Sequence, residues 1–212
     1  MAPLSDHTAL PLPVVDARTL DERHQRVLLP DQVLRDSKGR QRRLPRFFYE
    51  VDSWQTAQSV ELSEHFSLWE FLTVDVREAE PLRTFPRYVP CAVTALAAHL
   101  ELLREAVGTF IHLSANGGYR SPRHGLTDAA SRHCWGTAAN IYLIGDDYLD
   151  TQEKIERYGR MAEKRIPGCW VRPYGHDKGF ADDHLHIDLG YMLVVPHEAP
   201  SEAACGDKEA RQ

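Results

Sequence analysis

Hydrophobic residues recur along this chain at two spacings, one typical of helices and the other typical of strands. Between residues 88 and 107 they return every three or four positions, which predicts the clearest helix, with Gly108 as its C-terminal cap. The same spacing after a cap at Asp150 or Thr151 predicts a second helix that ends near residue 165. Each of these amphipathic helices needs an apolar surface to pack against.

Alternating apolar and polar residues predict short strands around these helices. The predicted strands cover residues 110–114, 138–144, 169–173, 185–189 and 192–195. Ser67 with Glu70 fits a capping box and predicts a short helix at 68–72. The order of these elements predicts an α+β fold, with helices packed on one face of a small, mostly antiparallel sheet.

The same patterns divide the chain into three parts. Residues 1–60 are predicted to form an N-terminal arm, weakly ordered to about residue 25, and a β-hairpin extension with its turn near Gly39. Residues 61–196 hold the periodic segments and are predicted to form the main domain. Residues 197–212 are polar and predict a disordered tail. With 212 residues and 42% hydrophobic content, the chain is long enough to bury a sizeable core.

Charge and composition narrow the classes of function. The chain has 25 Lys and Arg against 31 Asp and Glu, and its net charge of -6 gives no general attraction to nucleic acid or to anionic membranes. No segment approaches the roughly 20 apolar residues that span a bilayer, and the first residues lack the features of a signal peptide. The four cysteines have no CxxC spacing, which favours buried thiols in a reducing compartment and predicts a cytoplasmic protein.

Two short stretches carry most of the candidate chemistry. The first, residues 131–140, leads from His133 through several small residues to Asn140. Small residues allow the backbone to approach another element closely, which suits a turn that runs into a buried strand. We therefore expect His133 and Asn140 to be held close to the core.

In the second stretch, residues 183–188, polar and apolar residues alternate. Alternation puts His184, His186 and Asp188 on one face of a strand and the residues between them in the core. A polar face that carries imidazoles predicts a strand that lines a cleft. Because imidazole nitrogen is a common zinc ligand, His133 and His186 are the candidate ligands of a metal site.

Several of these residues stand at characteristic spacings. Ser131, His133, Gly136 and Ala138 fit the pattern SxHxxGxAxD, residues 118–121 read GYRS, residues 62–71 precede them, and Asp183 stands three positions before His186. These motifs resemble the zinc D-Ala-D-Ala carboxypeptidase and L-Ala-D-Glu endopeptidase family over roughly residues 61–192. That family includes vancomycin-resistance dipeptidases and phage endolysins, and it shares its fold with the Hedgehog signalling domain. The resemblance implies this fold, one zinc ion and hydrolysis of amide bonds in small peptides.

The chain departs from the family at Asn140, where the family has a carboxylate ligand. An amide oxygen is a neutral and weak donor, better suited to calcium than to zinc. Three explanations stay open. Zinc binds His133, His186 and a substitute, for which the candidates are His184, Asp183 and His124; zinc binds with Asn140 as a poor ligand; or the site is free of metal and only binds a ligand.

The resemblance also implies roles for the residues around the metal. Zinc held by His133, His186 and Asn140 or its replacement would lower the pKa of its water. Asp183 would take a proton from that water, and Arg120 would stabilise the developing negative charge. The predicted substrate-binding residues are Ser131, Tyr119 and His184.

We therefore expect a metal-dependent hydrolase that cleaves amide bonds in small peptides. Two alternatives are a non-catalytic relative that binds a small peptide and a repurposed metalloenzyme that acts on a small metabolite. Further expectations concern single residues. Phe66 and Trp69 should lie in the core, His124 and His176 at the surface, and Cys134 should be a buried thiol rather than a nucleophile.

Overall fold

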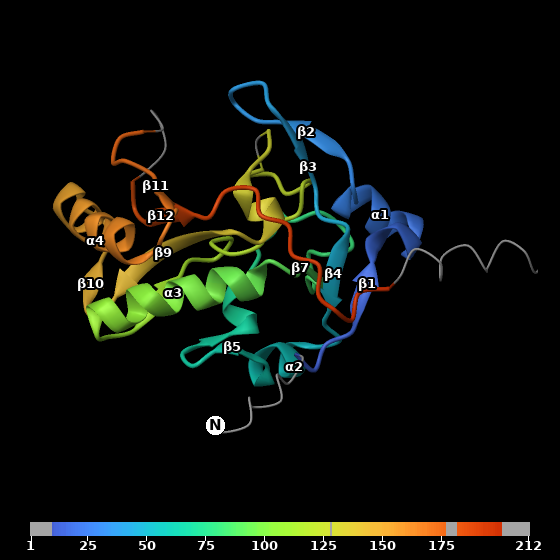
Figure 1. The fold of residues 1–212 in the computed structure, drawn as a ribbon, viewed down its shortest axis with the longest axis horizontal. Coiled ribbons are helices and arrows are strands. Elements are labelled where there is room, and N and C mark those ends of the chain that lie inside the picture. The colour runs from blue at the N-terminus through green and yellow to red at the C-terminus, as the bar shows by residue number, and fades with distance from the viewer. Residues whose placement is uncertain (1–9, 128, 177–181, 201–212) are drawn as a thin grey trace, which may run out of the picture.

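Two antiparallel sheets organise the chain in the computed structural model, which describes residues 10–127, 129–176 and 182–200 (Figure 1). The smaller sheet has the order β1-β4-β7, with β1 at Val14–Asp16, β4 at Phe47–Glu50 and β7 at Tyr88–Pro90. The larger sheet has the order β10-β9-β12-β11, and β8 also pairs with β9. Its strands are β8 (Ile111–Leu113), β9 (Ala138–Ile144), β10 (Asp147–Tyr148), β11 (Trp170–Val171) and β12 (Leu185–Asp188).

Two long helices cover one face of the larger sheet (Figure 1). They are α3 (Val93–Val107), which contacts β9, and α4 (Gln152–Arg165), which contacts α3, β11 and β12. Along β12, Leu185 and Ile187 are buried in the core, whereas His186 between them belongs to the opposite face. The prediction of an α+β fold with small antiparallel sheets is confirmed.

The N-terminal part of the chain shares one core with the rest. Its elements are η1 (Ala17–Thr19), α1 (Glu22–Leu28), the hairpin β2 (Val33–Arg35) with β3 (Gln41–Arg43), α2 (Trp54–Ser59), the pair β5 (Glu61–Ser63) with β6 (Phe66–Ser67), and η2 (Leu68–Phe71). The arm is predicted to be weakly ordered to about residue 25, but residues 14–28 contain β1, η1 and α1. A single buried cluster joins Leu28 and Phe48 of this part to Leu100 and Ile141.

The predicted helix over 88–107 begins later than expected. Its first residues form β7, because Pro90 has no N–H for the helix and favours an extended conformation at Val89 before it. Helix α3 then runs from Val93 and ends at Gly108, whose φ of 66° is the left-handed conformation expected of a glycine cap. The strand over 138–144 has the predicted bounds.

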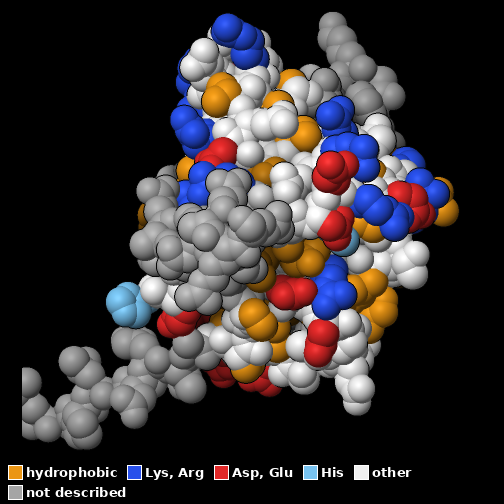
Figure 2. All heavy atoms as spheres, turned by 90° about the vertical axis from the view of Figure 1, so that its right-hand side faces the viewer, with side chains coloured by type: hydrophobic (Ala, Val, Ile, Leu, Met, Phe, Trp, Pro, Cys, Tyr) orange, Lys and Arg blue, Asp and Glu red, His pale blue; other side chains and the backbone are white. Residues whose placement is uncertain are grey.

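The β2–β3 hairpin has its turn at Gly39, as predicted, and a buried carboxylate fixes that turn. Asp36 accepts hydrogen bonds from the backbone N–H groups of Lys38 and Arg40, both at 2.9 Å. It also accepts from the Nε atoms of Arg40 at 2.9 Å and Arg42 at 3.1 Å. Basic side chains gather over the hairpin at the top of Figure 2. Because these hydrogen bonds converge on one carboxylate, the hairpin has a well-defined shape.

Three expectations about single segments are wrong. Residues 192–195 form no strand; they run beside Pro45 and Pro90, which have no N–H groups to pair with a new strand. Trp69, expected in the core, is 41% exposed, whereas Phe66 is buried as predicted. His124, expected at the surface, is 2% exposed because it takes part in a buried hydrogen-bond network.

The prediction of buried thiols is confirmed at two of the three cysteines in the described residues, and Cys169 is only partly buried. Cys91 and Cys134 are buried free thiols, and burial raises the pKa of each to about 12, so neither is a reactive thiolate at neutral pH. Cys205 lies outside the described residues. Among the helices in the described ranges, none has the length and apolar content needed to cross a bilayer.

Candidate functional site

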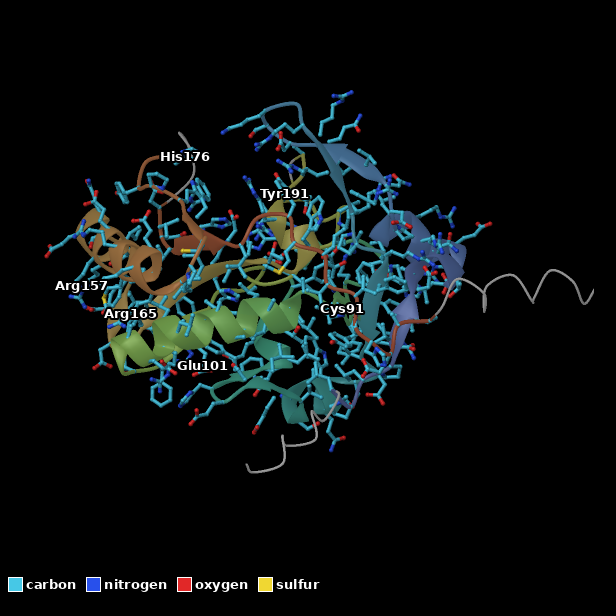
Figure 3. The ribbon with its side chains drawn as sticks, in the orientation of Figure 1. Cys91, Glu101, Arg157, Arg165, His176 and Tyr191 are labelled. Atoms are coloured by element: carbon cyan, nitrogen blue, oxygen red, sulfur yellow. The ribbon has the colours of Figure 1, made fainter. Side chains whose placement is uncertain are left out.

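A cleft of about 380 Å³ opens on the face of the larger sheet that the helices leave uncovered. Asn140 on β9 and His186 on β12 are direct cross-strand partners and line this cleft together. In Figure 3, His176 and Tyr191 lie on the side of the sheet away from α3. The lining side chains include Ser37, Arg120, Ser131, Arg132, His133, Asn140, Trp170, Arg172, His176, His186 and Tyr191.

His133 lies on the 3-10 helix η3 (Arg132–Trp135), which Gly136 ends with a φ of 68°. Its Nδ1 lies 2.7 Å from the carbonyl oxygen of Gly118, so Nδ1–H donates and Nε2 carries the free lone pair. Nε2 is buried and has no hydrogen-bond partner among the described residues. Burial lowers the pKa of His133 well below its usual value, and the positive charge of Arg120 adds to the shift. His133 therefore presents a neutral acceptor to the cleft.

The contact to His133 depends on Gly118 having no side chain. A Cβ at Gly118 would collide with the backbone of Phe71, whose carbonyl oxygen accepts the N–H of Tyr119 at 2.8 Å. The loop can therefore lie against η2 only with a glycine at this position. This close approach fixes the carbonyl of Gly118 at the point where it orients the ring of His133.

Two oxygen atoms flank the ring of His186, and a neutral imidazole can donate a hydrogen bond to only one of them. Its Nδ1 lies 2.8 Å from Oδ1 of Asn140, and its Nε2 lies 3.3 Å from Oδ2 of Asp188. Burial lowers the pKa of His186, although the carboxylate of Asp188 opposes the shift. The ring centroids of His133 and His186 are 5.2 Å apart. The structure thus brings the two remote stretches of sequence together at one cleft.

As they are placed, Asn140 and His186 are hydrogen-bonded to each other rather than spaced as two ligands of one zinc ion. Two ligands on one tetrahedral zinc stand about 3.3 Å apart, because each bond is about 2.0–2.1 Å long. Nδ1 of His186 and Oδ1 of Asn140 are at 2.8 Å, the distance of a hydrogen bond whose proton zinc would have to displace. Within the described ranges, no three His, Cys, Asp or Glu side chains are placed to hold a metal ion.

Arg120 is the buried cation of the cleft. Arg120 is only 8% exposed. Among the described residues, its guanidinium has no hydrogen-bond or ion-pair partner. Burial lowers the pKa of Arg120 to about 10, so the group still carries its charge at neutral pH. The carboxylate of Glu78 acts on this charge electrostatically, but Nε of Arg120 has no acceptor among the described residues. A buried charge in this state is costly, and a bound anion would offset the cost.

The other predicted site residues lie at different depths. Ser131 lines the cleft. Asp183 precedes β12, and its side chain is 70% exposed and contacts Nδ1 of His184 at 2.7 Å. His184 also contacts Arg172 through Nε2 at 3.0 Å. Tyr119 is 1% exposed and packs edge-on against Phe48 in the core. Asp183, His184 and Tyr119 are not among the residues that line the cleft.

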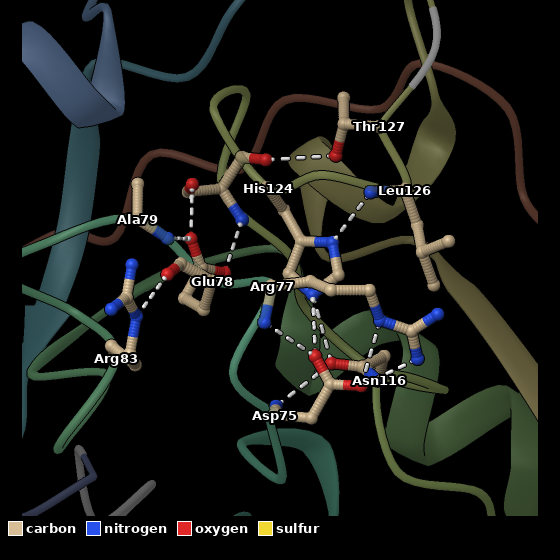
Figure 4. A network of polar contacts seen from close by, with 10 residues as sticks. Asp75, Arg77, Glu78, Ala79, Arg83, Asn116, His124, Leu126 and Thr127 are labelled. Atoms are coloured by element: carbon tan, nitrogen blue, oxygen red, sulfur yellow. Dashed lines mark hydrogen bonds and ion pairs between the residues drawn. The ribbon is translucent and has the colours of Figure 1, made fainter.

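His124 and its neighbours form a network of hydrogen bonds and ion pairs (Figure 4). Nδ1 of His124 accepts the N–H of Leu126 at 3.0 Å, and Nε2–H donates to Oδ1 of Asn116 at 2.9 Å. Glu78, 1% exposed, accepts from the N–H and hydroxyl of Ser121 at 3.1 and 2.5 Å and from the N–H of Ala79 at 2.7 Å. With both its nitrogens engaged, His124 has no lone pair free for a metal.

The motifs in the sequence do not reveal the basic and aromatic wall of the cleft. They include neither Arg132 nor Arg172 as a site residue, although both line the cleft. Ser37 reaches the cleft from the β2–β3 hairpin, which the pattern assigns to an extension. The residues next to Ser37 in the sequence do not predict this contact, because it depends on how the hairpin folds over the sheet.

Comparison of the chain with models of known protein families, with curated proteins and with solved structures gave no match. The resemblance to zinc peptidases therefore depends on the sequence motifs alone. Zinc binding and peptide hydrolysis both stay predictions.

Proposed function

We propose that this protein binds a small carboxylate-bearing molecule in the cleft beside His133 and His186. The observation that carries the proposal is the guanidinium of Arg120, which is buried, charged and without a partner among the described residues. Guanidinium groups bind carboxylates with two parallel hydrogen bonds, and such charge-assisted bonds are the strong ones.

The charge of the cleft supports an anionic ligand. Arg120, Arg132 and Arg172 contribute side chains to its wall, whereas the described residues that line it include no Asp or Glu. The nearest carboxylate, Asp188, lies beside His186 and accepts the N–H of Gly190 at 2.8 Å. A wall of this composition favours a bound anion and opposes a divalent cation.

The two imidazoles would then form hydrogen bonds with the ligand rather than hold a metal. His133 offers an acceptor at Nε2, which pairs with an N–H or O–H of the ligand. A volume of about 380 Å³ falls in the range of small-molecule sites. A carboxylate with a neighbouring hydrogen-bond donor therefore complements Arg120 and His133 together.

Calorimetric titration tests the proposal with propionate and with propionamide, its neutral analogue of the same shape. Propionate should bind and propionamide should not. Arg120→Gln should weaken propionate binding about 30-fold, which is about 2 kcal/mol for a charge-assisted hydrogen bond. Arg26→Gln is the matched control, because Arg26 lies on α1 with a side chain that is 71% exposed. Equal binding of acid and amide, or an unchanged affinity in Arg120→Gln, would overturn the proposal.

Metal-dependent hydrolysis of amide bonds remains as a second candidate, favoured by one observation. An imidazole that donates Nδ1–H to a backbone carbonyl and keeps Nε2 free is the arrangement typical of metal-binding histidines, and His133 has it. Elemental analysis of protein purified in zinc-containing buffer tests this candidate. About one zinc per chain, lost in His133→Ala, would support it, and no zinc in either Asn140→Asp or the natural sequence would rule it out.

A further inference from the structure

Unsatisfied polar atoms in the described residues gather around the cleft. Five buried side-chain nitrogen or oxygen atoms have no hydrogen-bond partner there, and four of them belong to residues that line the cleft. These four are Nε of Arg120, Nε of Arg132, Nε2 of His133 and Oη of Tyr191. Because buried polar atoms are nearly always paired, such a cluster marks a site that a ligand completes.

Arg132 and Tyr191 form a second group of unsatisfied polar side chains, one corner of the cleft wall. The guanidinium of Arg132 stacks on the ring of Tyr191, with 5.0 Å from Cζ to the ring centroid, and lies 5.7 Å from the centroid of Trp170. Arg42 of β3 lies over the ring of Tyr191 at 4.4 Å. Two guanidinium groups therefore pack against one phenol ring, with the carboxylate of Asp36 paired to Arg42 and that of Asp188 near Arg132.

Asp188, the acidic residue next to this corner, does not accept a hydrogen bond from Arg132. Nε of Arg132 and Oδ2 of Asp188 are 3.7 Å apart, beyond hydrogen-bond distance. The two oxygens of Asp188 already face the N–H of Gly190 at 2.8 Å and the ring of His186 at 3.3 Å. Nε of Arg132 and the hydroxyl of Tyr191 are thus left as two hydrogen-bond donors without an acceptor among the described residues.

The β2–β3 hairpin supplies the wall next to this corner. Ser37 in its turn lines the cleft, and the buried carboxylate of Asp36 holds the turn and the side chain of Arg42 in place. This wall lies outside residues 61–192, to which the motif resemblance is confined. The hairpin wall is therefore a part of the cleft that the motifs do not contain.

We propose that the ligand is a dicarboxylate, with one carboxylate at Arg120 and the second at the corner formed by Arg132 and Tyr191. This inference rests on the proposed function, because it extends carboxylate binding at Arg120 to a second position. A carboxylate accepts from several donors at once, so one group satisfies both Nε of Arg132 and Oη of Tyr191. The basic wall then faces two negative charges instead of one.

A calorimetric series from malonate to adipate, each paired with its monomethyl ester, tests the inference. We expect one dicarboxylate of the series to bind at least tenfold more tightly than its own monomethyl ester, because the ester removes one charge-assisted contact. Arg132→Gln should lower the affinity for that dicarboxylate to the level of the monoester and leave the monoester unchanged within about twofold. Tyr191→Phe, which keeps the stacked ring, should lower only the affinity for the dicarboxylate, about threefold.

The outcomes separate the two proposals. If monoesters bind through Arg120 but every dicarboxylate binds no better than its ester, the second subsite is overturned and carboxylate binding stands. The second subsite is also overturned if Arg132→Gln and Tyr191→Phe both fold and leave the dicarboxylate affinity unchanged. If neither acids nor esters bind at all, the proposed function itself fails.

Discussion

Buried polar groups on the two sides of the loop at residues 118–127 differ in whether they have hydrogen-bond partners. Behind the loop, Glu78, Ser121, His124 and Asn116 form a network in which each prominent donor and acceptor has a partner (Figure 4). In front of it, Arg120 and His133 are also buried, yet Nε of one and Nε2 of the other have no partner among the described residues. The two sides are adjacent in sequence and differ in whether their hydrogen bonds are complete.

We attribute this difference to two roles: completed polar groups stabilise the fold, and the incomplete ones are those that we propose bind a ligand. A completed network stabilises the native chain, because each buried group regains the hydrogen bonds that it had in water. A network with unpaired buried groups lowers stability, and natural proteins retain such groups mainly where function needs them. The comparison makes opposite predictions for substitutions on the two sides of the loop.

The largest effect is expected for Glu78→Ala behind the loop. This substitution leaves the N–H and hydroxyl of Ser121 and the N–H of Ala79 without an acceptor. The free energy of unfolding should fall by about 3 kcal/mol, which urea denaturation measures. Glu78→Gln keeps one acceptor oxygen and should cost about half as much. A loss below about 0.5 kcal/mol in Glu78→Ala would show that the network does not stabilise the loop.

The next effect is a pH dependence that involves His124. Burial lowers the pKa of His124, and protonation would break the bond that Nδ1 accepts from Leu126. His124 in the unfolded chain therefore binds a proton at higher pH than in the folded chain. The contribution of neutral His124 to the free energy of unfolding is complete above about pH 6.5 and is lost as the pH falls.

Urea midpoints at pH 7 and pH 5 measure this contribution. The natural sequence should lose about 1 kcal/mol more than His124→Asn over this interval, because the variant has no imidazole to protonate. The difference between the two proteins isolates His124 from the other histidines. Parallel pH profiles would contradict the assignment of a neutral, buried imidazole at this position.

The smallest effect is expected for Asp183→Asn. The carboxylate of Asp183 is 70% exposed, contacts the ring of His184, and does not line the cleft. Stability should change by less than about 0.5 kcal/mol, and carboxylate affinity by less than about twofold. A large loss of hydrolytic turnover on an amide substrate would instead support the role that the motif spacing implies for Asp183.

The sequence predicts well the elements whose signals are local. The strand at 138–144 and the cap at Gly108 follow from alternation and from glycine's freedom at positive φ, and both need only neighbouring residues. Leu185 and Ile187 are buried for the same reason. The predicted start of α3 is wrong because a single residue, Pro90, overrides an apolar periodicity that continues through it.

The site is predictable only in part, because only some of its contacts leave a trace in the sequence. The motifs correctly place His133, Asn140 and His186 as neighbours around one cleft. The prediction for His124 is wrong because nothing in its flanking residues reveals that Asn116 and Leu126 complete its hydrogen bonds. Ser37 and Arg42 reach the site only through the hairpin, a contact across a long stretch of chain that periodicity does not encode.

The central claim is that Arg120 is a buried cation, unpaired within the described residues, that a ligand's carboxylate completes. Urea denaturation of the natural sequence and of Arg120→Met, with and without propionate, tests it most directly. Without ligand, Arg120→Met should be more stable by about 1 kcal/mol, because it removes an uncompensated buried charge and keeps a similar volume. With ligand at about 100 times its Kd the natural protein should gain about 2.7 kcal/mol and become the more stable of the two. A destabilised Arg120→Met without ligand, and no gain of the natural protein on adding ligand, would contradict the account.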